Sequence, residues 1–266
     1  MDDLNDSEAS APVESIPPAR ERVLVIGAAG GIGQALVARL AARGASLVLA
    51  GRRLERVQAV AATYGAEALA LDATRLDDVM EAVARASAVA PLTGIVNLAG
   101  AILLKPAHRT SEREWLEVLG QNLGTAFACV RAAGQHLGAV AGRPASLVLV
   151  SSAAASIGLA NHEAIAASKA GVEGLVRSAA ATYARRGLRV NAVAPGLVRT
   201  PLAGQLATEP RMLEASNKMH PLGRIGEPAD VASGIAWLLD PETSWVTGQV
   251  LGIDGGLATL KPPTVA

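Results

Sequence analysis

The chain has 266 residues, which is enough for one large α/β domain or two small ones. Lys+Arg and Asp+Glu balance at 24 each and no basic run is present, so nothing in the sequence predicts binding to nucleic acid or to an anionic membrane. No apolar run is long enough to span a bilayer. The single cysteine, Cys129, excludes an intrachain disulfide framework and is typical of a reducing compartment, so we expect a cytoplasmic location.

Residues 1 to about 20 are acidic and end in Pro17-Pro18, so we expect a solvated, disordered tail. From Arg22 onward, apolar runs typical of buried strands alternate with stretches of helical periodicity. Strands are predicted over 22–26, 46–50, 67–71, 94–100, 146–152, 187–196 and 249–254. Helices are predicted over 33–44, 76–88, 111–137, 161–184 and 229–239. This alternation indicates right-handed βαβ units, a parallel sheet and a single α/β domain over 21–266.

A glycine-rich turn, GAAGGIG, joins the first strand to the first helix. Glycines allow a tight turn and a close approach of the backbone to a phosphate, and the helix N-terminus offers free N–H groups. A tight turn without a ligand also uses glycine, but the strand-turn-helix context favours a dinucleotide site. The residues predicted to bind the pyrophosphate are Gly27, Gly30, Gly31, Ile32 and Gly33.

The second strand ends in Gly51, followed by Arg52 and Arg53. Proteins that prefer NAD usually place a carboxylate here to bind the ribose hydroxyls. A guanidinium can instead form paired, charge-assisted hydrogen bonds with a 2′-phosphate. The sequence therefore favours NADP(H) over NAD(H), with Arg53 open to a second interpretation as a solvated residue of the next helix.

Over everything after Arg20, the chain resembles the short-chain dehydrogenases/reductases of the single-domain type. The segments that carry the resemblance are GAAGGIG, LDAT, NLAG, NLGTAF, VSS, SKAG, RVNAVAPGLVRTPL and GRIGEPADVA through GQVLGIDGG. The resemblance implies a Rossmann-like, doubly wound seven-stranded parallel sheet with helices on both faces, usually in a homotetramer. It also implies hydride transfer between a nicotinamide and a carbonyl or alcohol. The cofactor contacts that it implies are Asp72 and Ala73 at the adenine, Asn97, Ala99 and Gly100 in the groove, and Lys169, Pro195, Gly196, Val198 and Thr200 at the nicotinamide end.

The family's catalytic set is a serine, a tyrosine thirteen residues later and a lysine four beyond that. By this spacing Ser152 and Lys169 match the family, and Ile165 stands in the place of the tyrosine that donates the proton. The resemblance further implies that Asn122 anchors the water of the proton relay. The helix over 161–184 is therefore expected to be the active-site helix, with its acid missing.

Few side chains could replace that acid. Tyr183 lies about 21 Å along the same helix from Lys169, at about 1.5 Å per residue, and Tyr64 precedes the third strand, at the opposite edge of the sheet. His162 shares a helix face with Ile165 and Lys169 but lies about 4.5 Å nearer the helix start. It could act through a water, or be a first-turn histidine without a catalytic role.

Three functions stay open. The first is an enzyme whose reaction needs no tyrosine: NADP(H)-dependent reduction of an imine or iminium or of an activated C=C, or a reduction in which water delivers the proton through Ser152 and Lys169. The second is carbonyl reduction with His162 acting through water. The third is a catalytically inactive NADP(H)-binding sensor or supporting subunit. The segment 200–221 should form a lid over a partly apolar small-molecule substrate, with His220 at its hinge and His108 near the pocket edge.

Overall fold

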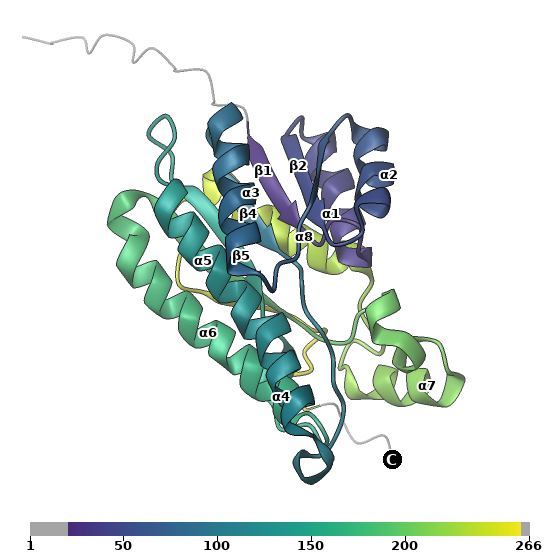
Figure 1. Cartoon of the computed structure of the whole chain (residues 1–266). Helices are drawn as coiled ribbons and strands as arrows, with labels where there is room; N and C mark the ends of the chain where they lie inside the picture. The colour runs from purple at the N-terminus through teal and green to yellow at the C-terminus, as the bar shows by residue number, and fades with distance from the viewer. Residues whose placement is uncertain (1–20, 262–266) are drawn as a thin grey trace, which may run out of the picture.

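The computed structural model describes residues 21–261. Seven parallel strands form one sheet in the order β3-β2-β1-β4-β5-β6-β7 (Figure 1). The strands are β1 (Arg22–Ile26), β2 (Ser46–Gly51), β3 (Glu67–Ala70), β4 (Gly94–Asn97), β5 (Ala145–Val150), β6 (Leu188–Pro195) and β7 (Val250–Ile253). The helices are α1 (Gly31–Ala42), α2 (Leu54–Tyr64), α3 (Leu76–Val89), α4 (Glu112–Leu119), α5 (Thr125–His136), α6 (Glu163–Tyr183), α7 (Pro210–Met219) and α8 (Pro228–Leu239). The predicted doubly wound, seven-stranded sheet is confirmed, while the predicted tail lies outside the described residues.

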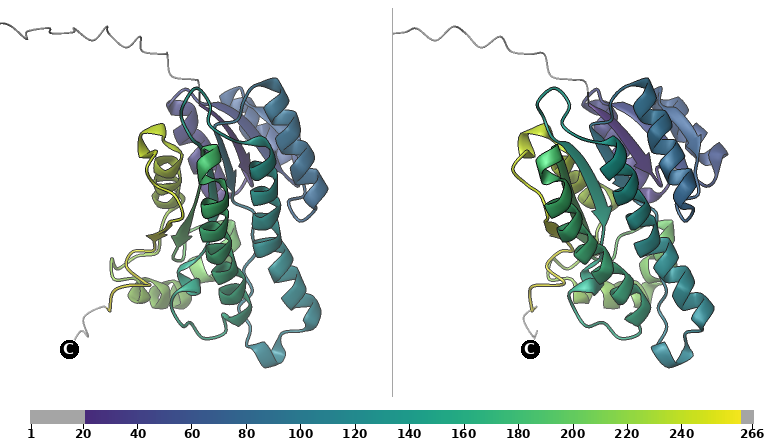
Figure 2. Two further views of the ribbon diagram at one scale, coloured as in Figure 1. Left: turned by 90° about the vertical axis from the view of Figure 1, so that its left-hand side faces the viewer. Right: turned by 60° about the vertical axis from the view of Figure 1, so that its left-hand side comes forward.

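Helices cover both faces of the sheet, as Figure 2 shows from the side. Successive residues of a strand point to opposite faces, and β1 illustrates the result. Leu24 and Ile26 pack into the layer that holds α3, α5 and α6. Val23 and Val25 pack into the layer that holds α1, α2 and α8. A sheet covered on both faces therefore requires strands that are apolar without alternation, as the run over 22–26 predicts.

Two predicted elements differ in detail from the structure. The helical stretch predicted over 111–137 is α4 and α5 joined by a π-helical turn, Gly120–Gly124. The active-site helix begins at Glu163 rather than at residue 161, because Asn161 takes a left-handed conformation with φ of 63°. Within residues 21–261, no helix combines the length and the apolar character needed to cross a bilayer.

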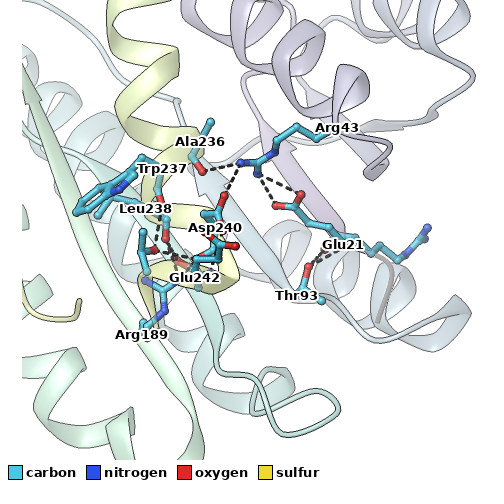
Figure 3. Close-up of polar contacts among 12 residues, drawn as sticks. Glu21, Arg43, Thr93, Arg189, Ala236, Trp237, Leu238, Asp240 and Glu242 are labelled. Atoms are coloured by element: carbon cyan, nitrogen blue, oxygen red, sulfur yellow. Dashed lines mark hydrogen bonds and ion pairs between the residues drawn. The ribbon is translucent and has the colours of Figure 1, made fainter. Parts of the chain in front are cut away.

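The amino ends of the strands are held together by two arginines (Figure 3). Arg43, just after α1, forms ion pairs with Glu21 at 2.8 Å and with Asp240 at 3.3 Å. Arg189, at 4% exposure, donates to the backbone oxygens of Leu238, Val246 and Asp240. These contacts join β1, β6 and the end of α8 at the edge of the sheet away from the cavity described below.

The segment between β6 and α8 lies apart from the two helix layers, with α7 at the lower right of Figure 1. It begins with a 3₁₀ segment, Pro201–Ala207, which bends at Gly204, where φ is 52°. Ala203, Ala207 and Ile225 form a small apolar cluster of their own. None of the residues of α7 is fully buried. This segment is therefore packed much more lightly than the rest of the fold.

Candidate cofactor and active site

A cavity of about 530 Å³ lies at the carboxyl ends of the strands. The strand order reverses between β1 and β4, and open parallel sheets bind ligands at such a switch point. The predicted site residues in the cavity lining are Gly27, Gly30, Gly31, Ile32, Gly33, Arg52, Arg53, Asp72, Ala73, Ala99, Gly100, Asn122, Ser152, Ile165, Lys169, Pro195, Gly196, Val198 and Thr200. Asn97 and His162, and His108, which was expected near the pocket edge, are not part of the lining.

The turn before α1 has the geometry of a phosphate site. Gly27 has a φ of 84°, which favours glycine. A Cβ at Gly33 would collide with the carbonyl oxygens of Gly27 and Ala28, so no side chain fits there. Helix α1 starts after Gly30 without any side-chain cap. Its first N–H groups are thus left for a ligand at the positive end of the helix dipole, and this turn fits the pyrophosphate of a dinucleotide.

Basic side chains surround the other end of the same cavity. Arg52, Arg53 and Arg56 all contribute to its lining, and all three are exposed. Asp72 is the acidic residue of this end, and hydrogen bonds from the Thr74 hydroxyl and backbone N–H, followed by the charge of Arg52, keep its pKa below the usual value. Arg56 was missed from the sequence, although its position one helical turn after Arg52 and Arg53 was a usable signal.

Two asparagines hold the loop after β4. Asn97 donates to the Thr125 hydroxyl at 3.1 Å and accepts from the Ala99 N–H at 3.1 Å, so its side chain supports the groove from behind. Asn122 lies in the π-helical turn, exchanges two hydrogen bonds with the backbone of Ala101, and donates to Ser168 at 3.2 Å. π-Helical turns within longer helices often occur at functional sites. Here the turn directs the Asn122 amide at the loop that lines the cavity.

Ser152, Ile165 and Lys169 all line the cavity; Ser152 follows β5, and Ile165 and Lys169 lie on α6. Lys169 is 6% exposed, and its Nζ donates to the Val150 carbonyl oxygen at 2.8 Å. Desolvation by burial lowers the pKa of Lys169 from 10.5 to about 8. The Ser152 Oγ accepts the Ala154 N–H at 3.2 Å, which leaves its own hydrogen free to be donated into the cavity. Ile165 is 5% exposed and contributes only hydrocarbon to the same wall.

The other candidate acids lie elsewhere. His162 contacts the Ala160 carbonyl through Nδ1 at 2.7 Å, outside the cavity lining. His108 is exposed in a short 3₁₀ helix. Tyr183 packs beside Arg186 and against Gly134, and Tyr64 ends α2. His220 is 4% exposed and engages the backbone through both ring nitrogens, beside the end of α7.

A parallel sheet with a glycine turn and an uncapped helix at its switch point defines a dinucleotide-binding α/β protein of the Rossmann type. Comparison with known families refines this class. A family model described as enoyl-(acyl carrier protein) reductase matches residues 27–258. The chain belongs to the short-chain dehydrogenase/reductase family. Membership implies a nicotinamide cofactor, which the phosphate turn described above fits.

Relatives are found over nearly the whole length of the chain. Cis-4-hydroxycyclohexanecarboxylate dehydrogenase of Sinomonas cyclohexanicum is 39% identical over 244 residues, covering 89% of this chain and 96% of that protein. Galactitol 2-dehydrogenase (L-tagatose-forming) of Cereibacter sphaeroides is 36% identical over 239 residues, covering 87% and 92%. A short-chain type dehydrogenase/reductase of Mycobacterium ulcerans has a similar structure, with a TM-score of 0.83, 29% identity and 91% coverage of both chains. These names place the chain among oxidoreductases.

Proposed function

We propose that this chain is an NADP(H)-dependent oxidoreductase that works without the family's tyrosine acid. Ile165 lines the same cavity as Ser152 and Lys169, and this apolar wall is the observation that carries the proposal. The cofactor supplies the hydride when it is bound. Gly27–Gly33 would hold its pyrophosphate and Lys169 its nicotinamide ribose. Ser152 would bind the acceptor, and solvent would supply the proton.

The charge of the cavity favours a conjugated C=C over a cationic iminium as the hydride acceptor. Among residues 21–261, the cavity lining has no titratable residue near Ser152 and Ile165 other than Lys169, and its one carboxylate, Asp72, belongs to the proposed adenosine end. A cationic iminium would therefore meet a cation and no counter-charge. A C=C conjugated to a carbonyl fits better, because hydride addition at the β-carbon moves an electron pair onto the oxygen. Ser152 and Lys169 can stabilise that enolate oxygen, and water then protonates the α-carbon, so no acid is needed at oxygen.

Three arginines support NADP(H) as the cofactor, because their charge and donors suit a 2′-phosphate. Arg52→Ala should weaken the binding of NADPH and leave that of NADH nearly unchanged. A charge-assisted hydrogen bond contributes about 1.5–3 kcal/mol, so the Kd for NADPH should rise roughly tenfold or more. Titration of NADPH and NADH fluorescence measures both constants. Glu55→Ala, a nearby change on α2, is the control, and equal weakening of both cofactors by Arg52→Ala would contradict the assignment.

The lowered pKa of Lys169 predicts an unusual alkaline limit. Below pH 8 its ammonium is protonated and can donate to ribose and substrate. As the pH rises through about 8, the ammonium loses its proton and kcat/KM should fall. An ordinary lysine, with a pKa of 10.5, would cause this fall at a pH more than two units higher. Rates recorded from pH 6 to 10 should show this limb in the native chain. Lys169→Met should be slower throughout and lack the limb, and the same limb in that variant would contradict the assignment.

The proposal is tested by following NADPH oxidation with three matched substrates: a cyclic enone, the corresponding saturated ketone and a cyclic imine. Turnover of the enone is expected, with less of the ketone and imine. Turnover of the imine alone would contradict the charge argument. Tight NADPH binding without turnover of any of them would favour the second candidate, an inactive NADP(H)-binding sensor or supporting subunit. The Ser152 hydroxyl lines the cavity and accepts only the Ala154 N–H, so it can still donate to a substrate; a pure binder has no use for this donor, which supports an enzyme.

We also propose a homotetramer in the cytoplasm, with the 200–221 segment as the substrate lid. The exposed small residues Ala167, Ala170 and Gly174 along α6 would permit close packing of a second copy. Trp115 and Phe127 add exposed apolar surface on α4 and α5. Leu202 and Ala203 of the lid segment reach the cavity lining, which supports a substrate with an apolar part.

A further inference from the structure

His220 forms hydrogen bonds with two segments: the loop after β6 and helix α7. Its Nε2 accepts the Leu197 N–H at 3.2 Å, and its Nδ1 lies 2.6 Å from the Ser216 carbonyl oxygen. A carbonyl only accepts, so Nδ1 carries the hydrogen and Nε2 is left as the acceptor. The ring is 4% exposed, and both of its nitrogens are therefore committed to backbone partners.

The loop after β6 forms part of the cavity wall. Gly196 and Leu197 both contribute to the lining directly after β6. A Cβ at Gly196 would lie 2.6 Å from His220 Nε2 and 3.1 Å from the Cα of Asp254. The imidazole thus fills the space directly behind the backbone of this wall. Any shift of Gly196 and Leu197 toward a bound cofactor changes the length of the bond to His220.

The other segment is α7, which His220 directly follows. Helix α7 has no fully buried residue and does not contribute to the cavity lining. Its last turn has one further side-chain bond to the segment before α8, in which the Ile225 N–H donates to Asn217 Oδ1 at 2.9 Å. Partly buried Leu213 adds an apolar contact with the small cluster around Ile225. Because so few contacts hold α7, the loss or gain of one of them should change how often the helix opens locally.

We infer that His220 is a positioning residue that couples α7 to the cavity wall, so that occupancy of the cofactor site is transmitted to the lid helix through the Leu197 N–H···Nε2 hydrogen bond. The inference rests on the proposed cofactor site. It assigns the buried histidine a role in ordering the lid rather than in proton transfer.

The test measures hydrogen–deuterium exchange of the full chain with and without saturating NADPH. In the native chain, NADPH should slow exchange at 27–33, at 195–200 and also at 210–219, although α7 does not touch the cavity. The slowing at 210–219 should be about two- to tenfold, the factor that corresponds to one hydrogen bond of about 0.5–1.5 kcal/mol.

Three variants distinguish coupling through His220 from a general loss of stability in α7. In His220→Asn the amide can still reach the Ser216 carbonyl but not Leu197, so NADPH should slow exchange at 195–200 and no longer at 210–219. In His220→Gln an acceptor reaches Leu197 again, and the response of α7 should return. Asn217→Ala is the matched control: it should speed exchange in α7 with and without NADPH but keep the difference between the two states.

The outcomes test the proposed cofactor site and the coupling through His220 separately. An α7 response that persists in His220→Asn overturns the coupling, as does its absence from the native chain when 27–33 is protected. If NADPH slows exchange nowhere, the proposed cofactor site fails and the coupling fails with it. Thermal melts come first. Should His220→Asn not fold, a folded His220→Gln without the α7 response also overturns the inference.

Discussion

Ile165→Tyr should give the chain ketone reductase activity with NADPH, or raise it by about 10²–10⁴-fold, which is the usual contribution of a general acid. Ile165 lines the same cavity as Ser152 and Lys169, so a hydroxyl introduced there should enter that cavity. The buried ammonium of Lys169 and the free hydrogen of Ser152 are already in place. The measurement is kcat/KM for a saturated ketone.

Ile165→Phe is the matched control, because it adds the ring without the hydroxyl. Both changes enlarge a side chain that is 5% exposed, and overpacking costs about 1–3 kcal/mol. Thermal melting and NADPH titration must therefore show that both variants fold and bind cofactor. A folded, NADPH-binding tyrosine variant that reduces ketones no faster than the phenylalanine variant would refute our account of Ile165.

Ser152→Ala should lower kcat/KM for the enone by about 10²–10³-fold, as the loss of one donor to a developing oxyanion usually does. The Kd for NADPH should not change, because the serine would bind the acceptor rather than the cofactor. Steady-state kinetics and fluorescence titration separate the two effects.

Ser151→Ala is the control for this change. Ser151 is the neighbouring residue and also borders the cavity, but its hydroxyl donates to Glu173 at 2.8 Å. Its removal should therefore alter kcat/KM little. Similar losses for both serines would mean that the end of β5 acts through packing, and the role proposed for Ser152 would be wrong.

The fold could be predicted because its signals are local. Buried strands such as Val23–Ile26 read as unbroken apolar runs, and the turn at Gly27–Gly33 combines backbone and steric requirements that only glycine meets. The π-helical turn at Gly120–Gly124 could not be predicted, because five residues are too short a stretch to show a period of their own. The start of α6 shifted because Asn161 adopts a left-handed conformation that depends on its loop.

That Ser152, Ile165 and Lys169 line one cavity could be predicted, because their spacing along the chain follows a motif. The site was not predictable where a side chain acts across a distance in sequence. His220 meets Leu197, a residue 23 positions earlier, and Asn97 meets Thr125, 28 positions later. Such bonds are set by the packing of loops, and the sequence carries no period or motif for them. The same holds for His162, whose exclusion from the cavity follows from the path of the loop before α6.

The light attachment of the 200–221 segment has an evolutionary consequence. Its apolar cluster of Ala203, Ala207 and Ile225 is separate from the two layers that stabilise the sheet, and the strong polar ties lie at the amino ends of the strands. Substitutions in this proposed substrate lid should therefore change the shape offered to a substrate at little cost in global stability. New specificities should then arise in the proposed lid without changes in the proposed cofactor site, which makes residues 200–221 a suitable target for laboratory evolution.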